Sequence, residues 1–387
     1  MMRVCMVTTS FPRWKGDWQG SFVFELARAL LKKGVQIRVV AMHSPGAAVH
    51  EHINGIEIFR PKYWWPERWE MLRKEGGGLP IVWQKYPLAR VQILPFFVIH
   101  TLATIRYAQS FDIVHAHWTL SAGAACLGRQ VHQKPIIVTV QGSDVLQVPS
   151  YPVGRWLTRK ILSSCDQITA LSCALRDKVI ALGINPEKVR VIPNGVDTTW
   201  FVPPKEEERE NLILFVGSLI ERKGVKYLIS AMPMILKLFP HYRLVIVGEG
   251  PQAYFLKELT NKANLTGYVS FVGSQSQEGV RAWMQRAKLL VLPSLEEGMG
   301  VVLIEALACG TPVVATYVDG IRDVVTPEVG ILVPPADSEA LFKGIQEVLS
   351  DHNRWAAMSR SARERAVKCY EWGQIADKFI ELYQWLM

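Results

Sequence analysis

Hydrophobic and polar positions along the chain follow one repeated pattern. A short run of β-branched and other apolar residues leads into a turn with Gly or a small polar residue, and a segment with apolar positions at helical spacing follows. Strands are expected to begin at Arg3, Val35, Asp112, Pro135, Asp166, Val189, Asn211, Tyr242, Val269, Ala287 and Pro312. This alternation predicts parallel strands joined by helical crossovers, which is the α/β class.

Helices are expected between these strands, most clearly at residues 21–33, 122–132, 174–182 and 225–238. A chain of 387 residues exceeds one ordinary core and predicts two doubly wound, Rossmann-like domains. The turn at Pro193-Asn194-Gly195, followed by Pro203-Pro204 and an acidic run, places the division near residue 205. We therefore expect an N-terminal domain at 1–204 and a C-terminal domain at 205–369. A terminal helix at 370–387 either caps the second domain or, as we expect, packs on the first.

Composition narrows the classes of protein and partner. The chain is 49% hydrophobic and 20% charged, which is typical of a globular protein. The six cysteines are scattered without a C-x-x-C pair, and neither a signal peptide nor a run of 18 apolar residues is present, so a cytoplasmic protein is expected. A net charge of +9 predicts an anionic partner. Nucleic acid is the weaker choice, because no arginine-rich tract or zinc-finger spacing occurs.

Two loops that follow strands in the second half suggest phosphate binding. In "GSLIERKGV", from Gly217, Arg222 and Lys223 precede a helix, where cations oppose the helix dipole and call for an anion. The alternative is a solvated basic turn. In "VGEGPQ", Gly248 and Gly250 permit close approach of the backbone to a ligand, although the full G-x-G-x-x-G pattern is absent.

A third loop, within "VLPSLEEGMGVVLIEALACGTPVV" from Val291, combines glycines with two carboxylates. The amides of Gly298 to Val301 open a helix and can point at an anion. Glu297 precedes this helix, whereas Glu305 lies more than one turn inside it. Because a carboxylate repels phosphate, we expect Glu297 to face neutral hydroxyls or a developing positive charge. Glu305, set back from the phosphate, suits a ribose diol. The alternative is one N-terminal carboxylate and one that faces solvent.

This loop resembles the hallmark of the retaining GT-B glycosyltransferases, the large family 4 or group 1 type. Their Glu-x7-Glu element is matched by Ser294, Glu297, Gly298, Gly300, Glu305, Ala306, Ala308, Gly310, Pro312 and Val313. The segments "HAHW", "GSD", "VIPNGVD", "GSLIERKG" and "VGEGP" also resemble family segments, in the expected order. The resemblance covers both expected domains. It implies the GT-B fold, two Rossmann-like domains that face each other across a cleft.

The resemblance also implies roles for individual residues. Glu297 would contact the donor sugar, Glu305 the ribose, and Arg222 with Lys223 the diphosphate, while His117 of "HAHW" would touch the donor sugar from the first domain. The other donor-binding positions would be Gly298, Met299, Gly300, Val301, Ser218, Gly248 and Gly250. The acceptor-side positions would be Gly16, Gly20 and Asp144. Gly16 and Gly20 also fit an ordinary strand-to-helix turn, and His117 also fits a core or capping histidine.

The family needs no metal, which agrees with the absence of an Asp-x-Asp motif here. Some positions depart from its pattern. Many relatives carry Arg where this chain has Ser218, and His where it has Gln141. The usual Gly-Gly of another loop is Asp319-Gly320, which leaves the donor contacts of that loop open.

The implied activity is transfer of a hexose-type sugar from a nucleotide-diphosphate sugar to an acceptor hydroxyl, with retention and without cofactor or metal. The acceptor is expected to be a saccharide or a lipid-linked saccharide. Alternatives are a disaccharide phosphorylase, a sugar-nucleotide epimerase, or a non-catalytic sugar or nucleic-acid binder. "PKYWWPERWEMLRKEGGG" and an apolar helix that starts at Pro95 fit an anionic membrane surface at the inner face of the cytoplasmic membrane. A buried crossover helix fits the same residues.

Overall fold

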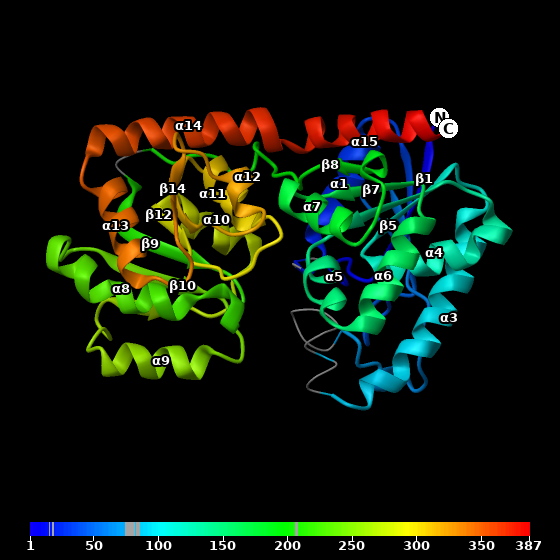
Figure 1. Cartoon of the computed structure of the whole chain (residues 1–387), viewed down its shortest axis with the longest axis horizontal. Coiled ribbons are helices and arrows are strands. Elements are labelled where there is room, and N and C mark those ends of the chain that lie inside the picture. The colour runs from blue at the N-terminus through cyan, green and yellow to red at the C-terminus, as the bar shows by residue number, and fades with distance from the viewer. Residues whose placement is uncertain (15, 18, 74–81, 83–85, 206–207) are drawn as a thin grey trace. The chain divides into compact units, whose positions relative to one another are not determined.

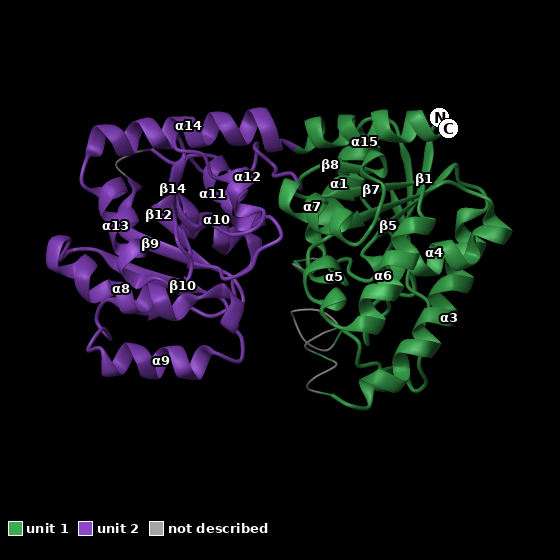
Figure 2. Cartoon of the chain, in the orientation of Figure 1, with its two compact units in different colours: residues 1–193, 372–387 green, residues 194–371 purple. Residues whose placement is uncertain are grey.

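The computed structural model describes residues 1–387 except 15, 18, 74–81, 83–85 and 206–207 (Figure 1). The chain forms two compact units (Figure 2). Unit 1 contains Met1–Pro193 and Trp372–Met387, and unit 2 contains Asn194–Glu371. The boundary between the units therefore lies after Pro193 and not after residue 204 as the sequence predicted, because the segment that follows Pro193 packs on unit 2. There the Arg363 guanidinium donates hydrogen bonds to the carbonyl oxygens of Thr198 and Phe201, each at 2.8 Å.

Unit 1 is built on a sheet in the order β3-β4-β2-β1-β5-β6-β7-β8. Its strands are β1 (Arg3–Thr8), β2 (Gln36–Ala41), β3 (His50–Ile53), β4 (Ile56–Phe59), β5 (Ile113–His117), β6 (Ile136–Val140), β7 (Gln167–Ala170) and β8 (Val189–Val191). All neighbours are parallel except β3 and β4, which form an antiparallel hairpin at the edge. Asn54 and Gly55 turn this hairpin with positive φ, as a two-residue turn requires.

Helices cover both faces of this sheet. They are α1 (Ser21–Lys32), α3 (Ala89–Ala108), α4 (Thr119–His132), α5 (Ser143–Leu146), α6 (Pro152–Ser164), α7 (Cys173–Ala181) and α15 (Trp372–Leu386), with short 3-10 turns at Glu67–Trp69, Val148–Ser150 and Pro186–Lys188. The α1 crossover runs toward the β3 edge, whereas the α3, α4 and α6 crossovers run toward β8. Right-handed connections therefore place α1 on one face and α3, α4 and α6 on the other.

The terminal helix α15 belongs to the core of unit 1. Ile375, Phe379 and Leu382 are buried in one apolar cluster with residues of β1, β2 and α1. The hydroxyl of Tyr383 lies 2.7 Å from Nδ1 of His115 in β5, and Nε2 of the same ring lies 2.7 Å from the Thr139 hydroxyl in β6. Both apolar burial and hydrogen bonds thus fix the end of the chain to the sheet of unit 1.

Unit 2 has a fully parallel sheet in the order β11-β10-β9-β12-β13-β14. Its strands are β9 (Glu210–Val216), β10 (Arg243–Val247), β11 (Val269–Phe271), β12 (Ala287–Leu292), β13 (Val313–Thr316) and β14 (Gly330–Val333). Its helices are α8 (Val225–Leu238), α9 (Ala253–Lys262), α10 (Gln277–Arg286), α11 (Val301–Ala308), α12 (Ile321–Val324), α13 (Ser338–Leu349) and α14 (His352–Tyr370), with a 3-10 turn at Glu221–Lys223. The predicted α/β class with two parallel sheets is confirmed.

Strand order reverses once in each sheet. In unit 2 the chain runs outward from β9 through β10 to β11, and in the other direction from β12 to β14. In unit 1 the same reversal lies between β1 and β5. Loops at the carboxyl ends of the two strands beside such a reversal leave a crevice between them, where open α/β sheets bind ligands. The strand order therefore directs attention to the loops after β9 and β12 and to those after β1 and β5.

Candidate functional site

The loops after β9 and β12 are held together by the backbone. The Leu295 amide donates to the Arg222 carbonyl at 2.7 Å. Gly224, with φ of 63°, lies so close that a Cβ would come within 2.0 Å of the Pro293 carbonyl oxygen. A side chain at Gly224 would push the loops apart. The basic loop and the Glu-x7-Glu loop thus form one cluster at the reversal point of unit 2.

The glycine loop after β10 joins this cluster through its own packing. A Cβ at Gly248 would lie 2.0 Å from the Gly217 carbonyl oxygen, and one at Gly250 would lie 2.5 Å from the Leu219 carbonyl oxygen. The Leu219 amide also donates to the Glu249 carbonyl at 2.8 Å. These two glycines therefore allow the loops after β9 and β10 to pack closely. They contact the two residues that flank the half-buried Ser218.

Lys223 and Glu297 form an ion pair at the centre of this cluster. Their side chains are only 14% and 12% exposed. Burial pushes the pKa of Glu297 up, but Lys223, Arg222 and the Gly298 amide outweigh it and hold the pKa of the carboxyl below its usual value. Within the described part of the chain, the guanidinium of Arg222 has no hydrogen bond or ion pair. The Lys223 ammonium is thus paired with Glu297, whereas the Arg222 guanidinium remains for an anion.

The helix α11 opens directly beside the pair. Gly300 precedes it in the left-handed conformation, with φ of 80°. Among the described residues, no hydrogen bond from the amides of Met299, Gly300 or Val301 is recorded, so these donors remain available at the helix N-terminus. The predicted helix start at this loop agrees with the structure, which has α11 at Val301–Ala308.

Glu305 lies more than one turn inside α11 and is half-buried. Burial raises the pKa of its carboxyl to about 8. No hydrogen bond or ion pair of this carboxyl is recorded among the residues that the structure describes. Glu305 therefore contributes little negative charge near neutral pH, yet can accept hydrogen bonds from hydroxyl groups.

Two further side chains position this cluster: that of Arg209, which was not singled out from the sequence, and that of Asp319, whose role the sequence left open. The buried Arg209 guanidinium donates to the Gly310 carbonyl at 3.1 Å and to the Thr311 hydroxyl at 2.9 Å, so it caps the carboxyl end of α11. The Asp319 carboxylate accepts from the Glu297 amide at 3.3 Å, and the Gly320 amide donates to the Glu297 carbonyl at 3.2 Å. Asp319-Gly320, whose role the sequence left open, thus holds the backbone of Glu297.

In unit 1, His117 ends β5 at the reversal point and is 1% exposed. The Gln141 side-chain amide donates to its Nδ1 at 3.2 Å. The ring proton is therefore on Nε2, which is buried and has no partner among the described residues. Burial lowers the pKa of His117 to about 3, so the ring stays neutral at physiological pH. His117 is a hydrogen-bond donor and not a proton acceptor.

The backbone beside His117 is strained and tightly held. Trp118 has φ of 67° and ψ of 150°, a conformation that is costly for a residue with a side chain. The Asp144 carboxylate accepts from the amides of Gln141 and Gly142, each at 3.0 Å, and from the Thr119 amide at 3.2 Å. Asp144, predicted on the acceptor side, thus uses its carboxylate to fix the loops around His117.

The loop after β1 contains the two other predicted acceptor-side residues. Gly20 has φ of 74°, and a Cβ there would lie 2.4 Å from the Ser10 carbonyl oxygen. Gly16 is exposed, and no atom of the residues that the structure describes lies within 4 Å of a Cβ built on it. Buried Arg60 donates to the Pro12 carbonyl oxygen and buried Arg73 to that of Phe11, and these hydrogen bonds hold the loop in place. Gly20 is therefore required for packing, whereas Gly16 is not.

The predicted residues thus form two groups, one at the reversal point of each sheet. The unit 2 group contains both glutamates, both cations and the α11 amides. The unit 1 group contains His117, Asp144 and Gly20.

Comparisons with known proteins identify the family of this chain. Residues 196–365 match the family described as glycosyl transferases group 1, and residues 19–200 match that described as glycosyltransferase family 4. The chain belongs to the group 1 glycosyltransferases. A glycogen synthase of Mycobacterium tuberculosis is 26% identical over 396 residues, 99% of this chain and 94% of that protein. A phosphatidyl-myo-inositol mannosyltransferase of Mycobacterium leprae is 28% identical over 380 residues, 94% of this chain and 92% of that protein.

Solved structures show the same fold for this glycosyltransferase. Sucrose-phosphate synthase from Thermosynechococcus elongatus superposes with a TM-score of 0.83 at 24% identity, over 100% of this chain and 99% of that one. HepE from Anabaena, solved with UDP and glucose, has a TM-score of 0.76 at 17% identity over 100% of both chains. The GT-B fold expected from the sequence is confirmed.

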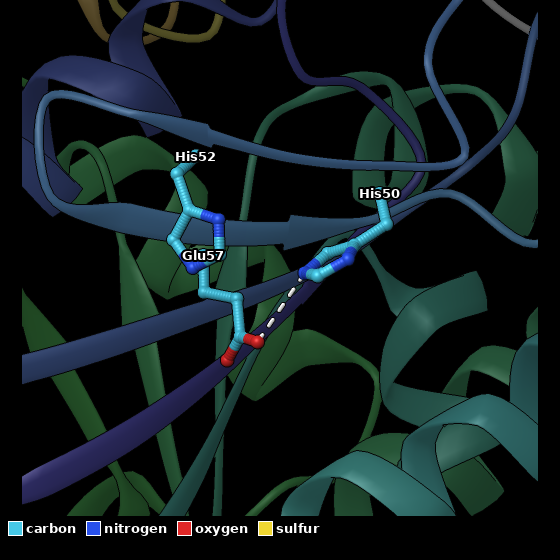
Figure 3. Close-up of side chains that lie close together, drawn as sticks. All are labelled: His50, His52 and Glu57. Atoms are coloured by element: carbon cyan, nitrogen blue, oxygen red, sulfur yellow. Dashed lines mark ion pairs between the residues drawn. The ribbon is translucent and has the colours of Figure 1, made fainter.

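One other cluster of this glycosyltransferase has the residue types of a metal site. His50 and His52 on β3 and Glu57 on β4 lie close together, with ligand atoms within 4.8 Å of one another (Figure 3). The Glu57 carboxylate, however, accepts from Arg38 Nε at 2.7 Å and lies 3.3 Å from His50 Nε2. These contacts satisfy the carboxylate within the protein, and we assign the cluster no role in the site.

The histidine geometry makes a prediction for this glycosyltransferase. His117→Ala removes a buried donor and should lower the turnover number about 10²-fold, the usual effect of losing one such hydrogen bond. Gln141→Leu should have a smaller effect, because Nδ1 loses the donor that fixes its tautomer. Nitrogen NMR should show the proton on Nε2 from about pH 5 to about pH 8, since the pKa of His117 is about 3. An imidazolium signal in this range would contradict the assignment.

Proposed function

We propose that this glycosyltransferase moves a hexose from a nucleotide-diphosphate sugar to an acceptor hydroxyl, with retention at the anomeric carbon and without a metal ion. The observation that carries the proposal is the cluster at the reversal point of unit 2. Its Lys223–Glu297 pair, Arg222 and the α11 amides supply hydrogen-bond donors for an anion, with Glu305 set back from them. A nucleotide sugar has the matching chemistry, two phosphates flanked by hydroxyl-bearing sugars.

Each group then has one task. Arg222, Lys223 and the amides of Met299 to Val301 bind the diphosphate and stabilise the charge that develops on it as it leaves. Glu305 accepts hydrogen bonds from a ribose diol. Glu297 accepts from hydroxyls of the donor sugar and keeps Lys223 in place. Because two cations and helix amides supply the positive charge, a divalent ion is not required.

The transfer needs no carboxylate as base. The bond between the anomeric carbon and the diphosphate oxygen breaks, and the acceptor oxygen bonds to the same carbon on the same face. The acceptor proton goes to the departing phosphate oxygen. In this scheme the neutral ring of His117, in unit 1, donates a hydrogen bond to the sugar. The side chains of the protein position the reactants and neither gain nor lose a proton.

The test is an assay for nucleotide diphosphate release in the presence of EDTA. A thermal-shift panel with UDP-, GDP- and ADP-glucose first selects the donor, and a panel of saccharide and lipid-linked acceptors is then screened. The proposal expects acceptor-dependent release that survives EDTA, and a product whose anomeric proton coupling in NMR equals that of the donor. Release that requires Mg²⁺, an inverted product, or phosphorolysis of a disaccharide without nucleotide would overturn it.

A further inference from the structure

The helix α3 turns an apolar stripe outward. Its solvent-exposed apolar residues, with the residue before it, are Leu88 (74% exposed), Val91 (63%), Leu94 (70%), Val98 (46%) and Leu102 (56%). The spacing of three and four places them on one side of the helix. Polar residues occupy buried positions instead, namely Gln92, His100, Thr101 and Thr104. The sequence expected a helix start at Pro95, but α3 begins at Ala89, and its outer side is not buried as the crossover alternative required.

Two neighbouring helices extend this stripe. The helix α4 lies between α3 and α6: a Cβ at Gly128 would lie 2.8 Å from Ile105 of α3, and one at Gly123 would lie 3.1 Å from Ile161 of α6. Figure 1 shows the three helices together in unit 1, and they cover the same face of its sheet. Further exposed apolar residues are Leu127 and Val131 on α4 and Val153, Trp156 and Leu157 on α6. We call this surface the α3–α4–α6 face.

The charge of these helices is of one sign. Together they contain Arg90, Arg106, Arg129, Arg155, Arg159 and Lys160, of which Arg129 is ion-paired with Asp166. They contain no Asp and no Glu, although the whole chain has 35 acidic residues against 44 basic ones. Arg90 and Arg106 lie near the two ends of the apolar stripe, and Lys160 lies over the Trp156 ring at 5.1 Å. The face thus combines exposed aliphatic side chains with cations.

The helix α3 has the length and composition to cross a membrane. Its inner side is nevertheless committed to unit 1. The Gln92 side chain donates to the Trp69 carbonyl at 2.6 Å and accepts from the Met71 amide at 2.9 Å, and α3 packs closely on Gly128 of α4. A helix with one side bonded to its domain and the other apolar can lie at an interface without spanning it.

We propose that the α3–α4–α6 face docks unit 1 on an anionic phospholipid bilayer. Aliphatic side chains enter the boundary of the acyl chains, and the surrounding Arg and Lys residues contact lipid phosphates. A nucleic acid would leave the leucine and valine stripe without a partner. A second copy of the chain, paired through the same face, would bring the cations together and repel. The consequence, that the acceptor hydroxyl belongs to a lipid-borne molecule, rests on the proposed function; the docking does not.

Vesicle flotation tests the docking without any need for activity. The full-length wild type should float with vesicles of phosphatidylcholine and phosphatidylglycerol and not with phosphatidylcholine alone. Leu94→Glu combined with Leu102→Glu should lower the bound fraction at least about tenfold, since charge enters the apolar boundary. The triple variant Arg155→Gln, Arg159→Gln and Lys160→Gln should lower binding by about ten- to hundredfold and weaken its salt dependence.

The matched control is Tyr254→Glu with Phe255→Glu on α9, which removes apolar residues that are 78% and 48% exposed in unit 2. This variant should float like the wild type. Equal flotation of all variants would overturn the proposal, as would a concentration-dependent dimer that the Leu94 and Leu102 variant abolishes in light scattering. Nucleotide-sugar binding, measured by thermal shift on the same variants, should not change. A wild-type protein that binds no nucleotide sugar would count against the proposed function and leave the docking result intact.

Discussion

Lys223→Met is expected to lower the rate of sugar transfer by about 10³-fold, because it removes a cation that stabilises the departing diphosphate. The same change leaves Glu297, whose side chain is 12% exposed, without its ion-pair partner. The free energy of unfolding should therefore fall by about 1–3 kcal/mol. Steady-state kinetics and urea unfolding measure the two effects separately.

A double variant separates catalysis from stability. Lys223→Met with Glu297→Gln removes both charges of the pair, so the unpaired carboxylate is gone and stability should return toward that of the wild type. Transfer should stay as slow as in the single variant. The matched control is Lys226→Ala, whose side chain is 37% exposed and lies 3.9 Å from Glu221. Full activity of the double variant would show that the pair is structural.

Glu305→Gln is expected to weaken nucleotide-sugar binding and to remove its pH dependence. In the wild type, burial raises the pKa of Glu305 to about 8. The ionised carboxylate accepts hydrogen bonds from a diol more strongly than the carboxylic acid does, so affinity should rise roughly tenfold from about pH 6.5 to about pH 8.5. A nucleotide sugar is the suitable ligand, because its phosphates do not titrate in this range. Calorimetric titration of both proteins across this range checks the expectation, and an unchanged slope in the variant would contradict it.

The same substitution should stabilise the fold at high pH. The pKa of Glu305 is raised on folding, so the folded state holds the proton more tightly than the unfolded chain does. Wild-type stability relative to the variant is therefore lost as pH rises from the ordinary glutamate pKa of 4.5 to about 8. At about pH 8 the variant should be more stable by about 1–2 kcal/mol, after allowance for partial exposure. Equal stability at about pH 5 is the internal control for thermal or urea unfolding.

The sequence predicted the groups of the unit 2 cluster because each lies close to a strand end in its own loop. Glycines and cations between an apolar run and a helical pattern are local signals, and Glu297 and Glu305 lie on the two sides of one such loop. That the loops after β9 and β12 share a reversal point depends on strand order, which no local pattern contains. Their joint position became visible only in the fold.

Other features could not be predicted because they depend on distant residues. Arg209 reaches Gly310, 101 residues away, and Tyr383 reaches His115, 268 residues away. The β3–β4 hairpin was missed although Asn54-Gly55 is a hairpin turn signal, because no strand was assigned between the one from Val35 and the one from Asp112. The sequence left open whether the segment around Tyr63 faces a membrane or is buried, and the structure divides it. The Tyr63 ring is 4% exposed and its hydroxyl accepts from the Leu72 amide, whereas Trp65 and Trp69 are 89% and 56% exposed.

The central claim is that the reversal point of unit 2 is an anion site for a diphosphate, and a crystal structure with the selected nucleotide sugar tests it most directly. The account predicts phosphate oxygens within hydrogen-bond distance of Lys223 Nζ and of the amides at Met299 to Val301, with the ribose diol on Glu305. A diphosphate bound elsewhere, or bridged to Glu297 and Glu305 by a metal ion, would contradict it.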